Sequence, residues 1–168
     1  MNIVLTGSTS PIGKIIFKHL TKRSFNVTVV GRDLYNIEEQ DKLVDITKNS
    51  DVFINSAHIG YLQGVLLEKS QARTNISFTS LITQYPWSIT QNFNTPEYIS
   101  QKLFLEHVHN STENSVLVSI SNYGNGPVPS ITDQQIIKTI DKIIDEKITS
   151  KDRIDISNGL GGLTLTSF

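Results

Sequence analysis

The chain has 168 residues, 38% of them hydrophobic and 18% charged, and it has no cysteine. This composition is typical of globular proteins, and the lack of cysteine excludes disulfides, thiolate nucleophiles and thiolate metal sites. The net charge of −1 gives no electrostatic reason for a nucleic acid or an anionic membrane as partner. We therefore expect a single cytoplasmic domain over residues 1–168, without a metal site.

The N-terminal part of the sequence begins with a strand, a helix and a second strand. Residues 2–5 form an apolar run that ends before Gly7, which predicts a buried strand. Ser10 is a suitable helix cap and Pro11 a suitable first helical residue, because the missing N–H of proline costs nothing there. Residues 26–31 predict the second strand. Shorter strands are predicted over residues 42–44, which end at Asp45, and over residues 51–55.

The C-terminal part continues the alternation of helices and strands. A long helix is predicted from about residue 63 towards residue 83, and Thr95 and Pro96 are a suitable start for another that continues to about residue 108. A strand over residues 115–120 precedes a helix over residues 132–148, which opens with the capping pair Thr132 and Gln135. The last strand covers residues 153–157. Apolar strands that alternate with helices indicate an α/β domain with a parallel sheet covered on both faces.

The turn after the first strand has the residues of a dinucleotide-binding turn. Such a site needs a tight strand-to-helix turn, a close approach of backbone to phosphate and close packing of helix on strand. Gly7 can supply the tight turn and Gly13 the close packing. Hydroxyls and amides of Ser8, Thr9 and Ser10 can face a pyrophosphate. A Walker A loop does not fit, because the hydroxyl residue that should follow the glycine-lysine pair is absent.

The ends of the following strands supply further candidate contacts. Arg32 follows the second strand, where the adenosine ribose of a dinucleotide lies, and its guanidinium can pair with a 2′-phosphate. NADP is therefore favoured as the cofactor, and NAD stays open. Other candidates lie at the carboxyl ends of two predicted strands, at the edge where open α/β sheets bind ligands. They are Asp45, Ile46, Asn55, Ser56 and Ala57.

Tyr98 and Lys102 are four residues apart and share one face of the helix predicted from residue 95. A phenol with a pKa of about 10 is a poor acid–base group at neutral pH. An ammonium group one turn away would stabilise the phenolate and lower that pKa, which predicts a proton donor. The spacing also fits a half-buried ring beside a lysine whose stem lies along apolar surface.

The order of these motifs resembles that of the short-chain dehydrogenase/reductase family over nearly the whole chain. The resemblance implies a single doubly wound Rossmann-like domain with a mostly parallel sheet of about six or seven strands. It also implies hydride transfer between a nicotinamide and a carbonyl or alcohol. The motifs that carry it are Thr6-Gly7 with Ile12-Gly13, Asp45-Ile46, Asn55-Ser56-Ala57, Asn75, Tyr98 with Lys102, Asn122-Tyr123-Gly124 with Pro127, and Asp155 to Gly159.

The resemblance implies roles for individual residues. Tyr98 would donate the proton to the carbonyl. Lys102 would bind the nicotinamide ribose and lower the pKa of Tyr98. Asn75 would lie on a helix and hold a water molecule of the proton relay. Ile12 would belong with Gly13 to the turn that binds the cofactor.

The chain departs from the family in two places where it is short. One lies ahead of Tyr98, where the family has its catalytic serine. We expect a remnant strand over residues 87–90, with Ser88 as the hydroxyl that polarises the substrate and Thr90 as its substitute. The other lies after Pro127, where the family has a lid over its substrate. Pro127 and Thr132 would contact the carboxamide of the cofactor.

Three functions remain open on these grounds. The leading one is an NADP-dependent carbonyl reductase or alcohol dehydrogenase that acts on a small molecule. A catalytically silent NAD(P)-binding sensor or scaffold protein is the alternative that the shortened segments favour. An epimerase or dehydratase of sugar nucleotides also uses a tyrosine–lysine pair, but it needs a larger C-terminal region. We further expect a homodimer or homotetramer that is paired through the tyrosine helix. His107 and His109 should cap the C-terminal end of that helix. His58 should lie near the nicotinamide.

Overall fold

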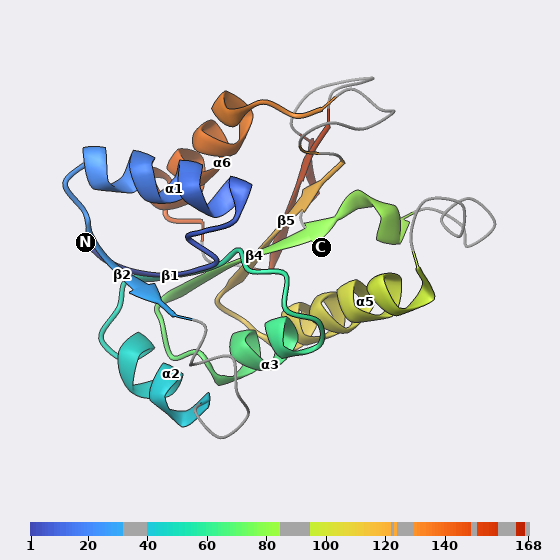
Figure 1. Ribbon diagram of the computed structural model, residues 1–168, viewed down its shortest axis with the longest axis horizontal. Helices are drawn as coiled ribbons and strands as arrows, with labels where there is room; N and C mark the ends of the chain where they lie inside the picture. The colour runs from blue at the N-terminus through green and yellow to red at the C-terminus, as the bar shows by residue number, and fades with distance from the viewer. Residues whose placement is uncertain are drawn as a thin grey trace.

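One sheet carries helices on both of its faces in the computed structural model (Figure 1). The structure describes residues 1–31, 40–84, 95–121, 123, 130–148, 151–157 and 164–166. Helices α1 (Pro11–Lys22) and α6 (Asp133–Asp145) cover one face. The other face is covered by α2 (Gln40–Thr47), α3 (Leu62–Lys69) and α5 (Pro96–Ser111).

The seven described strands have the order β2-β1-β3-β4-β5-β6-β7. All neighbouring pairs are parallel except β6 and β7. The strand bounds are Asn2–Thr6 for β1, Asn26–Val30 for β2, Val52–Asn55 for β3, Thr74–Ser80 for β4, Ser115–Ile120 for β5, Asp152–Ile156 for β6 and Thr164–Thr166 for β7. This is a Rossmann-like α/β fold, as the sequence predicted. Because the chain places β2 on one side of β1 and β3 on the other, the strand order reverses there, and ligands bind at such a point.

The two faces of the sheet are packed differently. On the face of α1 and α6, an apolar cluster joins Leu5, Ile16 and Ile140 with many other buried side chains. Under α5 the apolar cluster of buried residues is small and consists of Leu67, Leu105, Val108 and Leu117. Polar side chains also lie below this helix, where Thr79 of β4 and Arg153 of β6 both contact Glu106 of α5.

Two predicted elements are wrong. Residues 42–44 do not form a strand, because they belong to helix α2. The helix predicted towards residue 83 ends at Lys69, and β4 begins at Thr74, within the range predicted as helical. Within β4 the side chains of Ile76 and Phe78 pack on the apolar cluster below α1 and α6, whereas Thr79 faces α5. This alternation is the two-residue period of a strand. The strand expected over residues 87–90 lies outside the described residues.

The other predicted elements are confirmed to within a few residues. Helices α1, α5 and α6 begin at the predicted caps Ser10, Thr95 and Thr132, and each cap accepts a hydrogen bond from an N–H of the first turn. These caps satisfy amide groups that have no partner inside the helix. None of the described helices is long and apolar enough to cross a membrane.

Candidate active site at the carboxyl edge of the sheet

Gly7 makes the tight turn between β1 and α1. Its φ of +72° lies in the left-handed region, which glycine adopts at no steric cost. A Cβ at this position would lie 2.7 Å from the backbone nitrogen of Ala57. The turn can therefore lie against the end of β3 only without a side chain at residue 7. Ser8 is half-buried and Thr9 exposed in the same turn.

Ser10 and Gly13 join this turn to the first turn of α1. The hydroxyl of Ser10 accepts a hydrogen bond of 3.0 Å from the N–H of Gly13. A Cβ at residue 13 would lie 2.0 Å from the carbonyl oxygen of Gly7, so Gly13 supplies the predicted close packing. Ile12 is half-buried against the apolar cluster below α1. The strand, turn and helix of a dinucleotide-binding element are all present.

Polar contacts link the ends of β1 and β3 at the point where the strand order reverses. The hydroxyl of Ser56 donates to the carbonyl oxygen of Thr6 at 2.6 Å, and the hydroxyl of Thr6 donates to the side chain of Asn55 at 3.2 Å. The N–H of Ala57 donates to the hydroxyl of Thr6 at 3.3 Å. Asn55, Ser56 and Ala57 thus lie beside Gly7, at the carboxyl edge of the sheet where the sequence predicted them.

Tyr98 lies on the first turn of α5 and contacts the ends of two strands. Its ring packs edge-on against the ring of His58, which follows β3, with 5.0 Å between the ring centroids. The side chain of Ser80, the last residue of β4, is near enough to the phenol to influence its pKa. Because the hydroxyl of Ser80 already accepts from the N–H of Ile82, its own hydrogen can point to the phenol. Tyr98 therefore lies at the carboxyl edge of the sheet.

The electrostatic setting of Tyr98 differs from the predicted one. Burial raises its pKa above the ordinary value of 10.0, and the nearby side chain of Ser80 offsets part of that increase. Lys102 is not among the groups that shift this pKa, and the predicted lowering by Lys102 beside a bound nicotinamide stays a prediction. The ammonium nitrogen of Lys102 lies 5.7 Å from the centre of the Tyr98 ring. At neutral pH the phenol is protonated and can serve as a proton donor.

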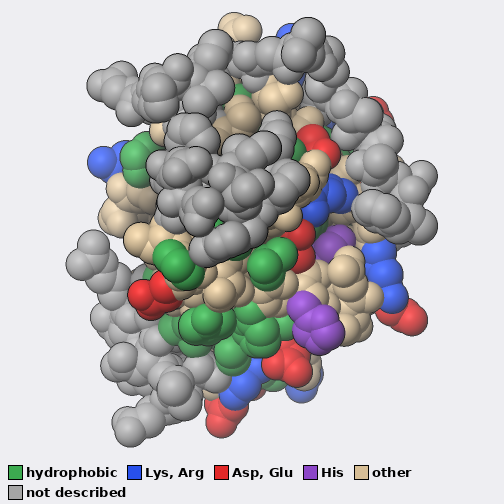
Figure 2. Space-filling model, turned by 90° about the vertical axis from the view of Figure 1, so that its right-hand side faces the viewer, with side chains coloured by type: hydrophobic (Ala, Val, Ile, Leu, Met, Phe, Trp, Pro, Cys, Tyr) green, Lys and Arg blue, Asp and Glu red, His purple; other side chains and the backbone are tan. Residues whose placement is uncertain are grey.

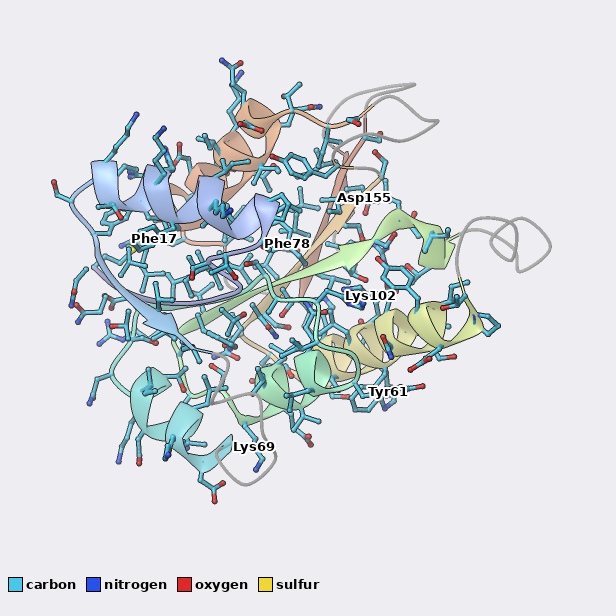
Figure 3. All side chains as sticks on the ribbon, in the orientation of Figure 1. Phe17, Tyr61, Lys69, Phe78, Lys102 and Asp155 are labelled. Carbon is cyan, nitrogen blue, oxygen red and sulfur yellow. The ribbon has the colours of Figure 1, made fainter. Side chains whose placement is uncertain are left out.

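Lys102 is buried between α5 and the sheet (Figure 3). Its ammonium group donates to the side-chain oxygen of Gln63 at 2.8 Å and to the carbonyl oxygen of Phe78 at 3.4 Å. Burial lowers the pKa of Lys102 from 10.5 to about 8, while the nearby carboxylate of Glu106 raises it. The side chain is still largely charged at neutral pH, and together with burial it lowers the pKa of His58.

Asp45 and Ile46 are not at the edge of the sheet, contrary to the prediction. Both lie on α2, where Asp45 is exposed and Ile46 packs on the apolar cluster between α2 and the sheet. The predicted contact with a dinucleotide depended on a strand ending at residue 45. Without that strand the two residues have no geometric basis for a role in cofactor binding.

Asn75 is also misplaced by the sequence prediction. It is the second residue of β4 rather than a helical residue, and it lies at the opposite end of that strand from Ser80. Its amide nitrogen donates to the side chain of Asn114 at 3.1 Å, which joins the amino-terminal ends of β4 and β5. Asn75 therefore cannot hold a water molecule beside Lys102.

Four candidate residues, Arg32, Ser88, Thr90 and Pro127, lie outside the described residues. Thr132 is the exposed cap of α6, and its N–H donates to the side chain of Gln135 at 2.8 Å. Since α6 follows β5, this cap lies on the carboxyl side of the sheet.

His109 does not cap α5 as predicted. It is buried, and burial lowers its pKa to about 4, so it is neutral.

Sequence reasoning missed Ser80 and Gln63. The signal for Ser80 was the alternation of polar and apolar residues over residues 75–79, which predicts a strand that ends one residue later. Gln63 gives no such signal, because a glutamine on a short helix is most often exposed. Its burial of 98% and its contact with Lys102 follow from the packing of α3 against α5.

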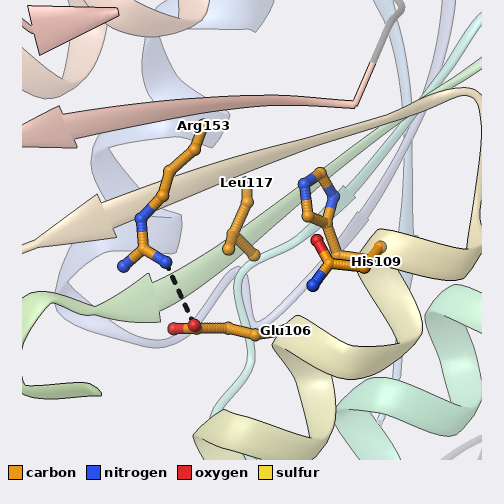
Figure 4. Close-up of a pocket in the computed structure, with 5 residues that line it drawn as sticks. Glu106, His109, Leu117 and Arg153 are labelled. Atoms are coloured by element: carbon orange, nitrogen blue, oxygen red, sulfur yellow. Dashed lines mark hydrogen bonds and ion pairs between the residues drawn. The ribbon is translucent and has the colours of Figure 1, made fainter. Parts of the chain in front are cut away.

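A cavity of about 120 Å³ lies beneath α5 but apart from this edge (Figure 4). It is lined by Glu106, His109, Asn110, Leu117 and Arg153. The guanidinium of Arg153 pairs with the carboxylate of Glu106 at 3.0 Å. Leu117 and Arg153 are partners in the middle of β5 and β6. The cavity thus lies below the middle of the sheet and is not part of the crevice beside Gly7.

The chain has structural neighbours among solved oxidoreductases. An oxidoreductase from Lactococcus lactis is 14% identical, with a TM-score of 0.70 over 95% of this chain and 91% of that chain. A dTDP-4-dehydrorhamnose reductase from Clostridium acetobutylicum is 17% identical, with a TM-score of 0.70 over 97% and 75% of the two chains.

A 3-alpha-hydroxysteroid dehydrogenase from a Pseudomonas species, complexed with NADH, is 11% identical, with a TM-score of 0.71 over 95% and 96%. No protein-family model and no curated protein sequence matches the chain. At these low identities the likeness shows the Rossmann-like fold, which this chain shares with nicotinamide-dependent oxidoreductases.

Proposed function

We propose that the protein is a nicotinamide-dinucleotide-dependent oxidoreductase of the short-chain dehydrogenase/reductase type that acts on a small-molecule carbonyl or alcohol. The position of Tyr98 carries the proposal. Its phenol lies at the carboxyl edge of the sheet, between His58 after β3 and Ser80 at the end of β4. Lys102 lies one helical turn away with a buried ammonium group.

The residues at the edge of the sheet suit a dinucleotide. A Cβ at Gly7 would lie 2.7 Å from the backbone nitrogen of Ala57, so a glycine at this position permits the tight turn that a dinucleotide site needs. Ser8 and Thr9 lie in the same turn at the start of α1, where an anion is stabilised by the helix dipole. When bound here, a nicotinamide dinucleotide supplies or accepts the hydride.

The protein side chains would handle the proton. Tyr98, protonated at neutral pH, donates its proton to the substrate oxygen during reduction and accepts it during oxidation. Ser80 has one hydroxyl hydrogen, which can turn from the phenol to the same oxygen when a substrate is bound. Lys102 stabilises the phenolate once the proton has left, since its positive charge is close and poorly screened by solvent.

Two measurements test the proposal. Purified protein is titrated with NADPH and with NADH, and binding is followed by nicotinamide fluorescence. The oxidation of either cofactor is then followed at its absorbance band with a panel of aldehydes and ketones. Binding of at least one cofactor and turnover with at least one carbonyl are expected. Absence of binding would end the proposal.

A silent dinucleotide-binding protein is the second candidate, and the state of Lys102 favours it. Its ammonium group is bonded inward to Gln63 and to the Phe78 carbonyl, and the pKa of Tyr98 is raised rather than lowered. The inward hydrogen bonds of Lys102 and the raised pKa of Tyr98 both mean that the site without a ligand is not preorganised for proton transfer. Binding without turnover on any carbonyl or alcohol would support this candidate.

We further propose that the protein pairs with a second copy through α3 and α5. Tyr61, just before α3, and Leu103 on α5 are 49% and 48% exposed, and Phe104 packs edge-on against Tyr61. Figure 2 shows hydrophobic side chains gathered on the lower half of the face it presents. Sedimentation analysis of Leu103→Glu beside the unchanged protein tests this, with a shift to monomer expected.

A further inference from the structure

Gln63 is a buried amide whose three side-chain hydrogen bonds are all made within the protein. It lies on the first turn of α3 and is 2% exposed. Its amide nitrogen donates to the carbonyl oxygens of Asn55 at 3.1 Å and Phe78 at 3.0 Å. These two carbonyls belong to β3 and β4, so the amide joins the ends of neighbouring strands.

The orientation of this amide is fixed by its surroundings. Both of its hydrogens are used by backbone carbonyls, which cannot act as donors. The side-chain oxygen must therefore point the other way, and it accepts from the ammonium group of Lys102 at 2.8 Å. A flipped amide would place its oxygen against two carbonyl oxygens and its nitrogen against the ammonium group. Each of these contacts would be repulsive.

We propose that Gln63 is a positioning residue that holds the ammonium group of Lys102 at the ends of β3 and β4 and keeps it charged there. The inference deepens the proposed function and rests on it, because it concerns the lysine that would bind the nicotinamide ribose. A buried ammonium group is costly unless acceptors surround it. Gln63 and the Phe78 carbonyl provide two acceptors without adding a negative charge.

The backbone of Gln63 also takes part in the link between Lys102 and the glycine turn. The side chain of Asn55 donates to the backbone carbonyl of Gln63 at 2.8 Å and accepts from the hydroxyl of Thr6, the residue before Gly7. Next to Gln63, a Cβ at Gly64 would lie 2.7 Å from the ring of Phe104 on α5. The absence of a side chain at residue 64 thus lets α3 approach α5 closely.

Three other titratable groups act near Lys102, and a test must separate them from Gln63. Glu106 follows one turn later on α5 and raises the pKa of Lys102. His58, whose pKa is lowered by Lys102, and Tyr98 lie on the side of the crevice. All three remain in place when only Gln63 is changed.

The test compares Gln63→Met with Gln63→Glu in the ligand-free protein. Both variants lose the two donors to the strand carbonyls, so they share that structural cost. They differ at the acceptor, which is absent in one and negatively charged in the other. Lysine labelled with ¹³C at the ε carbon is titrated by NMR, and the Lys102 signal is identified by its loss in Lys102→Met.

We expect the pKa of Lys102 to fall by about one unit in Gln63→Met, since a hydrogen bond to a charged group is lost. In Gln63→Glu it should rise by a similar amount. Gln71→Met is the matched control, because it makes the same substitution at an exposed glutamine and should leave the pKa unchanged. Shifts of the same sign in both Gln63 variants, or no shift in either, would overturn the inference.

The unchanged protein provides a second measurement in case a variant does not fold. The side-chain ¹⁵N signals of Gln63 should move with the same midpoint as Lys102, near pH 8, because the two groups are in direct contact. A Gln63 signal that stays constant through this titration would contradict the proposal. Neither measurement involves a dinucleotide. Failure of NADPH and NADH to bind would therefore refute the proposed function. The role of Gln63 in holding the charged Lys102 would still be decided by these titrations alone.

Discussion

The ring of His58 lies edge-on to the ring of Tyr98, with an interplanar angle of 63°. His58 follows the strand end that touches Gly7, whereas Tyr98 opens the helix that covers the other half of the sheet. The contact joins the two halves of the candidate site, which lie far apart in the sequence. The Tyr98 ring therefore lies beside the segment that follows β3, next to the point where the strand order reverses.

Tyr98→Phe should abolish turnover and leave the affinity for the dinucleotide nearly unchanged. The substitution removes the hydroxyl and keeps the ring that packs on His58. General acid catalysis contributes about 10²- to 10⁴-fold, so a loss of that size is expected in kcat. Steady-state kinetics and fluorescence titration check the two parts. Tyr61→Phe is the control at an exposed tyrosine, and turnover that survives without the Tyr98 hydroxyl would refute the assignment.

Ser80→Ala should lower kcat by about tenfold or more. The side chain of Ser80 lowers the pKa of the phenol, so the loss of its hydroxyl should also move the basic limb of the pH profile upward. Ser88→Ala and Thr90→Ala are measured in parallel, since these hydroxyls were the sequence-based candidates. Full activity of Ser80→Ala together with an inactive Ser88→Ala would return the role to Ser88.

Gly7→Ala should destabilise the protein by about 1–3 kcal/mol and weaken dinucleotide binding. The added Cβ meets the backbone of Ala57, and the positive φ is unfavourable for alanine. Gly60→Ala is a matched control with a φ of +67°, because its nearest neighbour is the side chain of Gln101 at 3.4 Å. Urea unfolding and fluorescence titration should show a larger loss of stability and of dinucleotide affinity for Gly7→Ala than for Gly60→Ala. Equal losses in the two variants would contradict the close contact between Gly7 and the backbone of Ala57.

The stability of the protein should decrease between pH 6.5 and pH 4 because of His109. Burial, aided by Arg153 and Lys151, lowers its pKa from 6.5 to about 4. The unfolded chain therefore binds more protons than the folded protein in this window. As the pH decreases from 6.5 to 4, the free energy of unfolding decreases by up to about 3 kcal/mol. Urea unfolding across the window should show a weaker pH dependence in His109→Gln. His107→Gln, at an exposed site on the same helix, should behave like the unchanged protein.

NADPH should bind more tightly than NADH, because Arg32 stands where an acid would favour NAD. In Arg32→Ser the affinity for NADPH should fall by about tenfold, the effect expected for a lost charge-assisted pair with phosphate. The affinity for NADH serves as the internal control and should change little. Equal affinities in the unchanged protein, measured by fluorescence titration, would count against this preference.

The helices that could be predicted are those with local signals. Ser10 with Pro11, Thr95 with Pro96, and Thr132 with Gln135 are caps whose hydrogen bonds lie within one turn, so the sequence contains them in full. The order of motifs was sufficient to predict the Rossmann-like sheet.

The errors arose where tertiary packing decides the structure. The short apolar segment around Leu43 can form either a strand or a turn of helix. It forms part of α2 because Leu43 is then buried, and this burial exists only in the folded protein. The placement of Asn75 followed from reading an alternating segment as a helix. Gln63 could not be found at all, because its partners come from β3, β4 and α5.

Gly64 has a consequence for how the sequence of this protein can change over time. A methyl group there would force the ring of Phe104 aside, and this ring belongs to the helix that carries Tyr98 and Lys102. A larger residue at position 64 is therefore tolerated only together with a smaller one at position 104. Homologous sequences should show these two positions varying as a pair.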